Sequence, residues 1–279
     1  PFAPGSLSFV NVAELLALVP LPIPRIREEA PDLGILAIDD LGDVTLQAHT
    51  NSAPLMVHLP LYEQAVDYLV LLQQRGAQLQ SARFLPYQLA FDVEKLMWEM
   101  DFFIRHFLEG FRGVTISTEV REALREELLA LVRTLSAEPR VVCHRDYHSR
   151  NLMVTPDRLV VIDFQDARMG PDTYDLVSLL RDSYVDLPAP FVDHLIDRFR
   201  TARGGAEDRA TFNQRFHLMS VQRNLKALGT FGYQAVARAN PAYAQYVPRT
   251  LAHIRRTISI EARCTRLREL LAPLLPELA

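Results

Sequence analysis

The 279-residue chain is poor in several features, and each scarcity excludes a class of protein. It has two cysteines, Cys143 and Cys264, which cannot build a disulfide framework and indicate a reducing compartment, the cytoplasm. It has no run of basic residues, and a net charge of −4 with a pI near 6.1 opposes a nucleic-acid partner. We see no low-complexity segment and no internal repeat.

Long apolar runs are missing as well. The apolar stretch 12–23 contains Glu14, Pro20 and Pro22 and has no basic leader, so it predicts neither a signal peptide nor a membrane span. With 49% hydrophobic and 23% charged residues, the composition is that of a soluble globular protein. The length allows one sizeable core or two small ones.

One segment of the sequence carries a clear chemical signal. His144 to Leu152 reads HRDYHSRNL. Asp163 lies twelve residues after Asn151, at the end of an apolar run. Phosphoryl transfer needs a carboxylate that orients the attacking hydroxyl and accepts its proton, together with oxygen ligands for metal ions that hold the phosphates. Asp146 fits the first role, and Asn151 and Asp163 fit the second.

The spacing of these residues agrees with a hairpin. Runs 152–154 and 159–162 are apolar and β-prone, and Thr155-Pro156-Asp157-Arg158 between them predicts a turn. Asn151 and Asp163 would then lie side by side on neighbouring strands about 5 Å apart, where both could reach one Mg²⁺. A lone His-x-Asp in a polar loop is common by chance, but the combined features favour the phosphotransfer interpretation.

The remaining pattern predicts an α+β fold with a small strand-containing front part followed by helices. Helical spacing is expected over 11–19, 61–79, 87–108, from Thr118 to Leu135 and over 173–181, and the chain from Phe191 onward is helix-rich. We expect strands at 34–38 and 141–143, and loops at 39–43 and 165–171. The aromatic residues of 87–108 are either core or functional.

The motif residues resemble the aminoglycoside phosphotransferase family, which has the protein-kinase-like fold and counts choline and homoserine kinases among its relatives. Segments 162–167 and 170–171 belong to the same family likeness, and segments 174–182 and 222–229 extend it toward bacterial kinases that phosphorylate N-acetylmuramate and N-acetylglucosamine at the anomeric hydroxyl. The resemblance implies ATP and Mg²⁺ as cofactors, an amino sugar of cell-wall recycling as acceptor, and no nucleic-acid or membrane partner.

The resemblance also implies roles for individual residues. Asp146 would be the catalytic base, Asn151 and Asp163 the metal ligands, and the backbone of Asp39-Asp40-Leu41 the hinge that meets adenine. His148 or Arg150 would supply a positive charge at the transferred phosphate, unless Arg150 is only a solvated loop residue. Three further residues would hold the loop in place: His144, Arg145 and Asp175. Asp175 could instead be an ordinary carboxylate at a helix start.

An element of such enzymes is missing from the sequence before the loop. We find no glycine-rich strand pair followed by a strand lysine, because Gly5, Gly34 and Gly42 lie in other contexts. The expectation is a truncated nucleotide-binding lobe and hinge at 1–43, with a helical lobe at 44–279 that holds the catalytic loop and acceptor site. A protein of these residues alone would bind ATP weakly and turn over poorly.

Charge separates the candidate acceptors. From Gln165 onward basic residues outnumber acidic ones, which suits a neutral or anionic sugar better than a polycationic aminoglycoside, unless these arginines are simply solvated. A choline-type kinase is another alternative, and so is a non-catalytic pseudokinase that lost its nucleotide lobe. The candidate substrate residues are Glu99, Asp101, Gln165, Asp166, Arg181 and Arg223.

Overall fold

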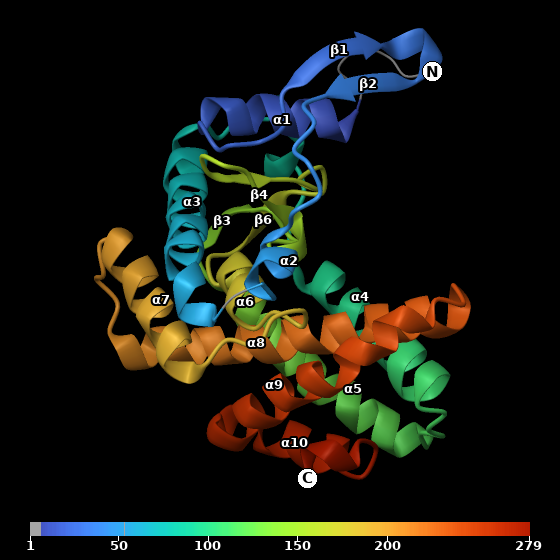
Figure 1. Cartoon of the computed structure of the whole chain (residues 1–279). Coiled ribbons are helices and arrows are strands. Elements are labelled where there is room, and N and C mark those ends of the chain that lie inside the picture. The colour runs from blue at the N-terminus through green and yellow to red at the C-terminus, as the bar shows by residue number, and fades with distance from the viewer. Residues whose placement is uncertain (1–6, 53) are drawn as a thin grey trace. The chain divides into compact units, whose positions relative to one another are not determined.

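The computed structural model describes residues 7–52 and 54–279 (Figure 1). Contacts divide the described chain into two compact units. The first holds the residues up to Ala90 with Pro139–Leu180 and Leu187–Ala206, and the second holds Phe91–Glu138, Arg181–Asp186 and Glu207–Ala279. This division follows contacts rather than lobes, and the lobe boundary expected between residues 43 and 44 stays a prediction.

The named strands of the described chain all lie in the first unit, in three antiparallel pairs. They are β1 (Ile26–Ala30) with β2 (Ile35–Ile38), β3 (Arg140–Cys143) with β6 (Arg168–Pro171), and β4 (Leu152–Val154) with β5 (Leu159–Val161). The hairpin predicted around the turn at Thr155 is confirmed, with Leu152 opposite Val161.

The expectation of a loop over residues 165–171 is wrong in part, because Arg168–Pro171 forms β6. Its sequence, with Gly170 and Pro171, has low strand propensity. The strand forms because it supplies backbone partners to the buried strand β3, with Val141 opposite Gly170 and Cys143 opposite Arg168. A contact between segments far apart in the sequence thus overrides local preference.

The first unit also contains α-helices. They are α1 (Ser8–Leu18), α2 (Leu46–Thr50), α3 (Leu59–Gln78), α6 (Tyr174–Leu180) and α7 (Ala189–Ala202). The longest of them, α3, runs beside β3 and packs on α7 (Figure 1). Its buried face carries apolar residues at helical spacing, such as Tyr62, Val66 and Leu69, all with no exposed surface.

The second unit is helical throughout its described elements. They are α4 (Val93–Phe103), α5 (Thr118–Ser136), α8 (Arg209–Gly232), α9 (Val247–Ile260) and α10 (Thr265–Leu271). No helix of the described ranges, in either unit, is long and apolar enough to cross a membrane. The sequence predicts α5 well, and the hydroxyl of Ser117 caps it by accepting a hydrogen bond from the Val120 amide.

The long helix or helix pair expected over residues 87–108 is correct in type, but its main part begins later than expected. A 3₁₀ turn at Leu85–Tyr87 precedes it, and α4 begins only after Asp92, whose carboxylate accepts a hydrogen bond from the Lys95 amide at 2.7 Å. The helix then widens into a π-helix, η4, at Ile104–Phe111. The helix α8 ends in a second π-helix, η6, at Tyr233–Ala237.

Gly232 allows α8 to approach η4 very closely. A Cβ atom at Gly232 would lie 2.3 Å from the carbonyl oxygen of His106, which cannot move without breaking the π-helix. We therefore expect Gly232→Ala to lower the free energy of unfolding by about 2 kcal/mol or more, because overpacking forces a backbone shift. Urea denaturation measures this change.

A matched control is Gly110→Ala, which places a Cβ in η4 itself, 3.3 Å from the Arg105 carbonyl oxygen. Alanine in a helix is favoured over glycine by about 0.5–1 kcal/mol, so this variant should stay close to the parent protein. Equal stability of the two variants would contradict the close approach of α8 and η4.

Candidate functional site

The loop of residues 144–151, which carries Asp146, links β3 to β4 within the first unit. Asp146 lies at its centre with a quarter of its side chain exposed, and its carbonyl oxygen accepts hydrogen bonds from the His148 amide at 3.0 Å and the Asn151 side chain at 2.9 Å. Next to it the buried Tyr147 donates its hydroxyl to the Ala65 carbonyl on α3. The loop is thus fixed on both sides while the Asp146 carboxylate keeps contact with solvent.

Asn151 and Asp163 converge as their spacing predicts. The short 3₁₀ helix η5 (Ser149–Asn151) leads into β4, and the Ile162 amide donates to the Asn151 carbonyl at 3.0 Å, which extends the hairpin by one pair. The side-chain nitrogen of Asn151, Nδ2, lies 3.2 Å from Asp163 Oδ2. Asp163 has a left-handed backbone, with φ of 64°, and strain of this kind clusters at functional sites.

The donors of this pair suit a hard divalent cation. An amide and a carboxylate supply oxygen ligands, and Mg²⁺ is usually held by one or two carboxylates plus substrate phosphates rather than by a protein cage. The described ranges contain no group of three or more histidine, cysteine or acidic side chains that could hold a metal ion. Gln165, a candidate substrate residue, instead donates its side-chain amide to Asp163 Oδ1 at 2.8 Å.

Asp175 holds the start of the loop. Its carboxylate is fully buried at the first turn of α6 and accepts hydrogen bonds from two backbone amides, that of His144 at 2.6 Å and that of Arg145 at 3.0 Å. Arg145 has a φ of 86°, a conformation that is costly for a residue with a side chain. The two amides are therefore kept together by the carboxylate of Asp175.

His144 is a second support beneath the loop. Its ring is buried, and Nε2 lies 2.9 Å from the Ile162 carbonyl oxygen, which can only accept, so Nε2 carries the proton. Burial lowers the pKa of His144, although the nearby carboxylates of Asp146 and Asp163 oppose this shift. The ring is therefore neutral near pH 7 and ties the loop of residues 144–151 to the end of β5.

Asp166, another candidate substrate residue, has its carboxylate between two arginine side chains. Arg145 Nη1 lies 2.7 Å from Asp166 Oδ2, and Arg168 Nη2 lies 3.8 Å from its other oxygen. The side chain of Arg145 also lies 3.8 Å from the Asp146 carboxylate. Arg145 thus joins the two acids, and a role of Asp166 in substrate binding stays a prediction.

His148 immediately precedes η5 and Arg150 lies within it, and both are partly exposed. The carbonyl of His148 accepts a hydrogen bond from the Asn151 amide at 2.9 Å, which closes the turn. Either side chain can still supply the positive charge expected near the transferred phosphate, and the choice between them stays open.

The segment expected to form the hinge, residues 39–41, is followed by residues that bind the β4–β5 hairpin. After it, the Val44 carbonyl accepts a hydrogen bond from the Val154 amide of β4 at 2.8 Å. The Asp39 amide donates to the Arg25 carbonyl, and the Arg25 amide and Arg27 side chain bind its carboxylate. The hydrogen bond from the Arg25 backbone lowers the pKa of Asp39, together with Arg27.

Asp39 therefore uses its amide within the β1–β2 hairpin, and only its carbonyl and the backbone groups of the next two residues can meet a base. Asp40 accepts a hydrogen bond from the Gly42 amide in a tight turn, and Leu41 between them is half-buried. The hinge role of Asp39, Asp40 and Leu41 stays a prediction.

The four other candidate substrate residues belong to the second unit. Glu99 is buried and accepts a hydrogen bond from the Gln222 side chain at 2.8 Å, whereas Asp101 forms a bidentate ion pair with Arg125 at 2.7 and 2.9 Å. Arg181 stacks on Phe216, and Arg223 is 8% exposed. Sequence reasoning missed the Glu99–Gln222 pair, because nothing local links residues 123 positions apart.

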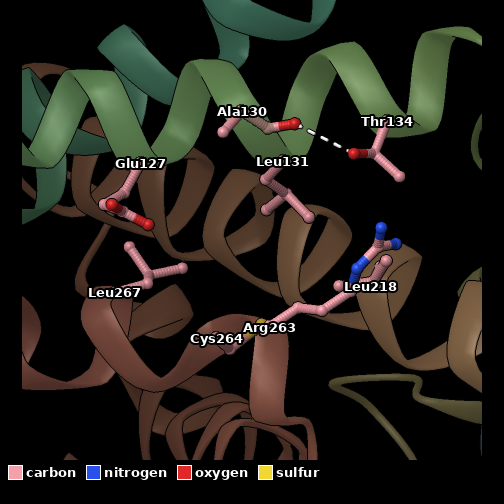
Figure 2. Close-up of a pocket in the computed structure, with 8 residues that line it drawn as sticks. All are labelled: Glu127, Ala130, Leu131, Thr134, Leu218, Arg263, Cys264 and Leu267. Carbon is pink, nitrogen blue, oxygen red and sulfur yellow. Dashed lines mark hydrogen bonds between the residues drawn. The ribbon is translucent and has the colours of Figure 1, made fainter.

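A cavity of about 230 Å³ lies within the second unit, and its floor is apolar. It is lined by Glu127, Ala130, Leu131, Thr134, Leu218, Arg263, Cys264 and Leu267, which come from α5, α8, α10 and the turn before α10 (Figure 2). Burial raises the pKa of the Cys264 thiol to about 12, with a further contribution from the nearby acids. The thiol is therefore protonated at neutral pH and is a poor nucleophile.

Comparisons with known proteins find similar sequences and structures. Residues 3–212 match the model of the phosphotransferase enzyme family. A protein of Neisseria meningitidis named N-acetylmuramate/N-acetylglucosamine kinase is 33% identical to this chain, over 89% of this chain and 73% of that protein. A protein of the same name from Pseudomonas aeruginosa is 33% identical to this chain, over 95% of this chain and 77% of that protein.

Solved structures show the same fold. A choline/ethanolamine kinase family protein from Mesorhizobium loti covers 94% of this chain and 81% of its own, with a TM-score of 0.60 at 16% identity. The choline kinase LicA from Streptococcus pneumoniae covers 89% of this chain and 80% of its own, with a TM-score of 0.59 at 13% identity. The fold is thus the protein-kinase-like fold, mostly helical with small sheets.

Proposed function

The chain belongs to the phosphotransferase enzyme family, and we propose that it transfers the γ-phosphate of ATP, with Mg²⁺, to a hydroxyl group of an amino sugar. The acceptor class is N-acetylmuramate and N-acetylglucosamine, with the anomeric hydroxyl as the site of phosphorylation. The observation that carries this proposal is the likeness, over most of the chain, to kinases named for these two sugars.

The catalytic loop supports the chemistry. Asp146 would accept the proton of the attacking hydroxyl, since its carboxylate is partly exposed while its backbone is held by Asn151 and His148. Asn151 and Asp163 would hold Mg²⁺, which neutralises charge that develops on the phosphate oxygens. The hinge 39–41 would receive adenine, and His148 or Arg150 would face the transferred phosphate.

The acids of the second unit argue against a cationic acceptor. Asp101 is already neutralised by Arg125 in a bidentate pair, and Glu99 has 1% of its surface exposed. A polycationic aminoglycoside or a quaternary ammonium wants solvent-facing acids that are not already paired, whereas Asp101 is exposed but paired with Arg125, and Glu99 is buried. Arg181 and Arg223 would suit a neutral or anionic sugar, because arginine binds carboxylates in a bidentate manner.

A panel assay tests the proposed acceptor. The full-length gene product, with ATP and Mg²⁺, is supplied in turn with N-acetylmuramate, N-acetylglucosamine, kanamycin and choline. We expect ADP release with the two sugars, at a kcat/KM at least 100-fold above that with kanamycin or choline. Phosphorus NMR of the product should show an anomeric phosphate. Turnover of kanamycin with none of either sugar would reject the assignment.

A further inference from the structure

The cavity shown in Figure 2 is lined only by residues of the second unit. Its floor consists of side chains that are more than nine-tenths buried: Leu131, Leu218, Cys264 and Leu267. Its rim carries an acid, a hydroxyl group and a cation: Glu127, Thr134 and Arg263. An apolar floor with a few polar groups around it is the usual composition of a small-molecule site.

One wall of the cavity is a single face of α5. Glu127, Ala130, Leu131 and Thr134 follow one another at spacings of three and four residues, which places their side chains on the same side of the helix. Each residue advances a helix by about 1.5 Å, so Glu127 and Thr134 are separated by about 10 Å along its axis. The acid therefore marks one end of this wall, and the hydroxyl group marks the other.

Arg263 brings a positive charge to the end of the cavity that holds Thr134. It lies in the 3₁₀ turn η8 (Ala262–Cys264), and its side chain extends toward Thr134 and away from Glu127 (Figure 2). The nearby Glu261 carboxylate accepts hydrogen bonds from the Arg263 backbone amide and from the Gln214 side chain, not from the guanidinium. Among the residues that the structure describes, no ion pair occupies the Arg263 guanidinium or the Glu127 carboxylate.

The lining between these two ends is uncharged. Burial raises the pKa of the Cys264 thiol to about 12, with a contribution from nearby acids, so the thiol is neutral at pH 7. Thr134 donates its hydroxyl to the Ala130 carbonyl at 3.1 Å, and its oxygen can still accept a hydrogen bond from a ligand. Along α5 the cavity thus offers a carboxylate, an apolar stretch, and then a guanidinium beside a hydroxyl acceptor.

We propose that this cavity binds a short apolar peptide with free ends, its ammonium group on Glu127 and its carboxylate on Arg263. An extended chain advances by about 3.3–3.6 Å per residue, so three residues span the roughly 10 Å between the two ends. The volume of about 230 Å³ is small for a ligand site, which excludes longer peptides and most lipids. The inference does not depend on the proposed kinase function.

The opposite charges at the two ends favour this class over simpler apolar ligands. A fatty acid would place its carboxylate on Arg263, but its alkyl end would desolvate the Glu127 carboxylate without giving it a partner. An aliphatic amine would leave the guanidinium in the same position. A peptide with free ends satisfies both, because arginine binds a carboxylate through two parallel hydrogen bonds and the acid pairs with the ammonium group.

A set of matched ligands tests the proposal. The tripeptide Ala-Leu-Ala is compared with its N-acetyl derivative, its C-terminal amide and octanoate in ligand-observed NMR titrations of the protein. We expect Ala-Leu-Ala to bind saturably with a Kd of about 1 mM or below, as its size allows. Each capped derivative lacks one charge and should bind about 5-fold more weakly, the effect of one partly exposed ion pair.

Two substitutions assign the ends of the peptide. Glu127→Gln should weaken binding of Ala-Leu-Ala by about 5-fold and leave that of the N-acetyl derivative unchanged, because this derivative has no ammonium group. Arg263→Met should have a similar effect on Ala-Leu-Ala and leave the C-terminal amide unchanged. The matched controls are Glu126→Gln and Arg266→Met, which change exposed charges on α5 and α10 outside the cavity lining and should leave every Kd unchanged.

The competing occupants give different results, and each overturns the proposal. Equal binding of the free and capped peptides would indicate a segment inside a longer protein chain, and octanoate binding as tightly as Ala-Leu-Ala would indicate a fatty acid. The absence of saturable binding, or a Kd of Ala-Leu-Ala that neither variant changes, rejects the site itself. Arg263 is exposed and Glu127 half-buried, so both variants should fold, and urea denaturation checks that they do.

Discussion

Replacing Asp146 with asparagine should lower kcat by about 10²–10⁴-fold, the usual contribution of a positioned general base. The substitution keeps the shape of the side chain but replaces its negatively charged carboxylate with a neutral amide, which cannot accept the proton. The backbone of the loop should stay in place, because Asn151 and His148 bind the Asp146 carbonyl rather than its side chain. Single-turnover kinetics with ATP and N-acetylmuramate measure the chemical step.

The binding of ATP separates this effect from a general loss of structure. We expect the Kd of ATP for the Asp146→Asn variant to stay within a factor of about three of the parent value, a difference below 1 kcal/mol. Asp157→Asn is the matched control, because Asp157 lies in the exposed turn of the same hairpin. Retained activity of the Asp146→Asn variant would show that another residue accepts the proton.

Asp175→Ala should lower both stability and activity. The substitution leaves the amides of His144 and Arg145 without their buried acceptor, and each unsatisfied donor costs about 1–3 kcal/mol. Without these bonds, Arg145 has less reason to keep its left-handed backbone. We expect the free energy of unfolding to fall by about 2–5 kcal/mol, measured in urea, and kcat to fall by about 10-fold or more.

A second buried carboxylate serves as the control. Asp172 is 3% exposed and forms an ion pair with Arg203 away from the loop. Asp172→Ala should lower stability by a comparable amount, because it leaves Arg203 without this carboxylate, but kcat at a temperature where the variant is folded should be retained. Equal loss of kcat in both variants would mean that Asp175 acts only through overall stability.

The parts of the site that the sequence predicted are those that local structure determines. Asn151 and Asp163 meet because a short hairpin joins them, and both the turn and the two apolar runs lie within that segment. The same holds for α5, where a regular apolar stripe marks the helix. In these places every physical signal lies within a few residues of its effect.

The parts that were not predicted depend on contacts between distant segments. The strand β6 forms only because β3 needs a partner, and the Asp39 amide is used by Arg25 across the β1–β2 hairpin. The two π-helices arise where Gly232 meets the backbone of His106, a contact between residues far apart in the sequence. Propensity and periodicity contain no information on such pairs.

The interleaving of the two units has a consequence for the order in which the protein can be completed during synthesis. The residues of the first unit have all been made once Ala206 has left the ribosome, but the second unit needs Glu207–Ala279 to join Phe91–Glu138. The apolar faces of α4 and α5 must therefore wait for α8, which covers them. During that interval they are a site for chaperone binding or aggregation, and no single cut of the chain would release either unit whole.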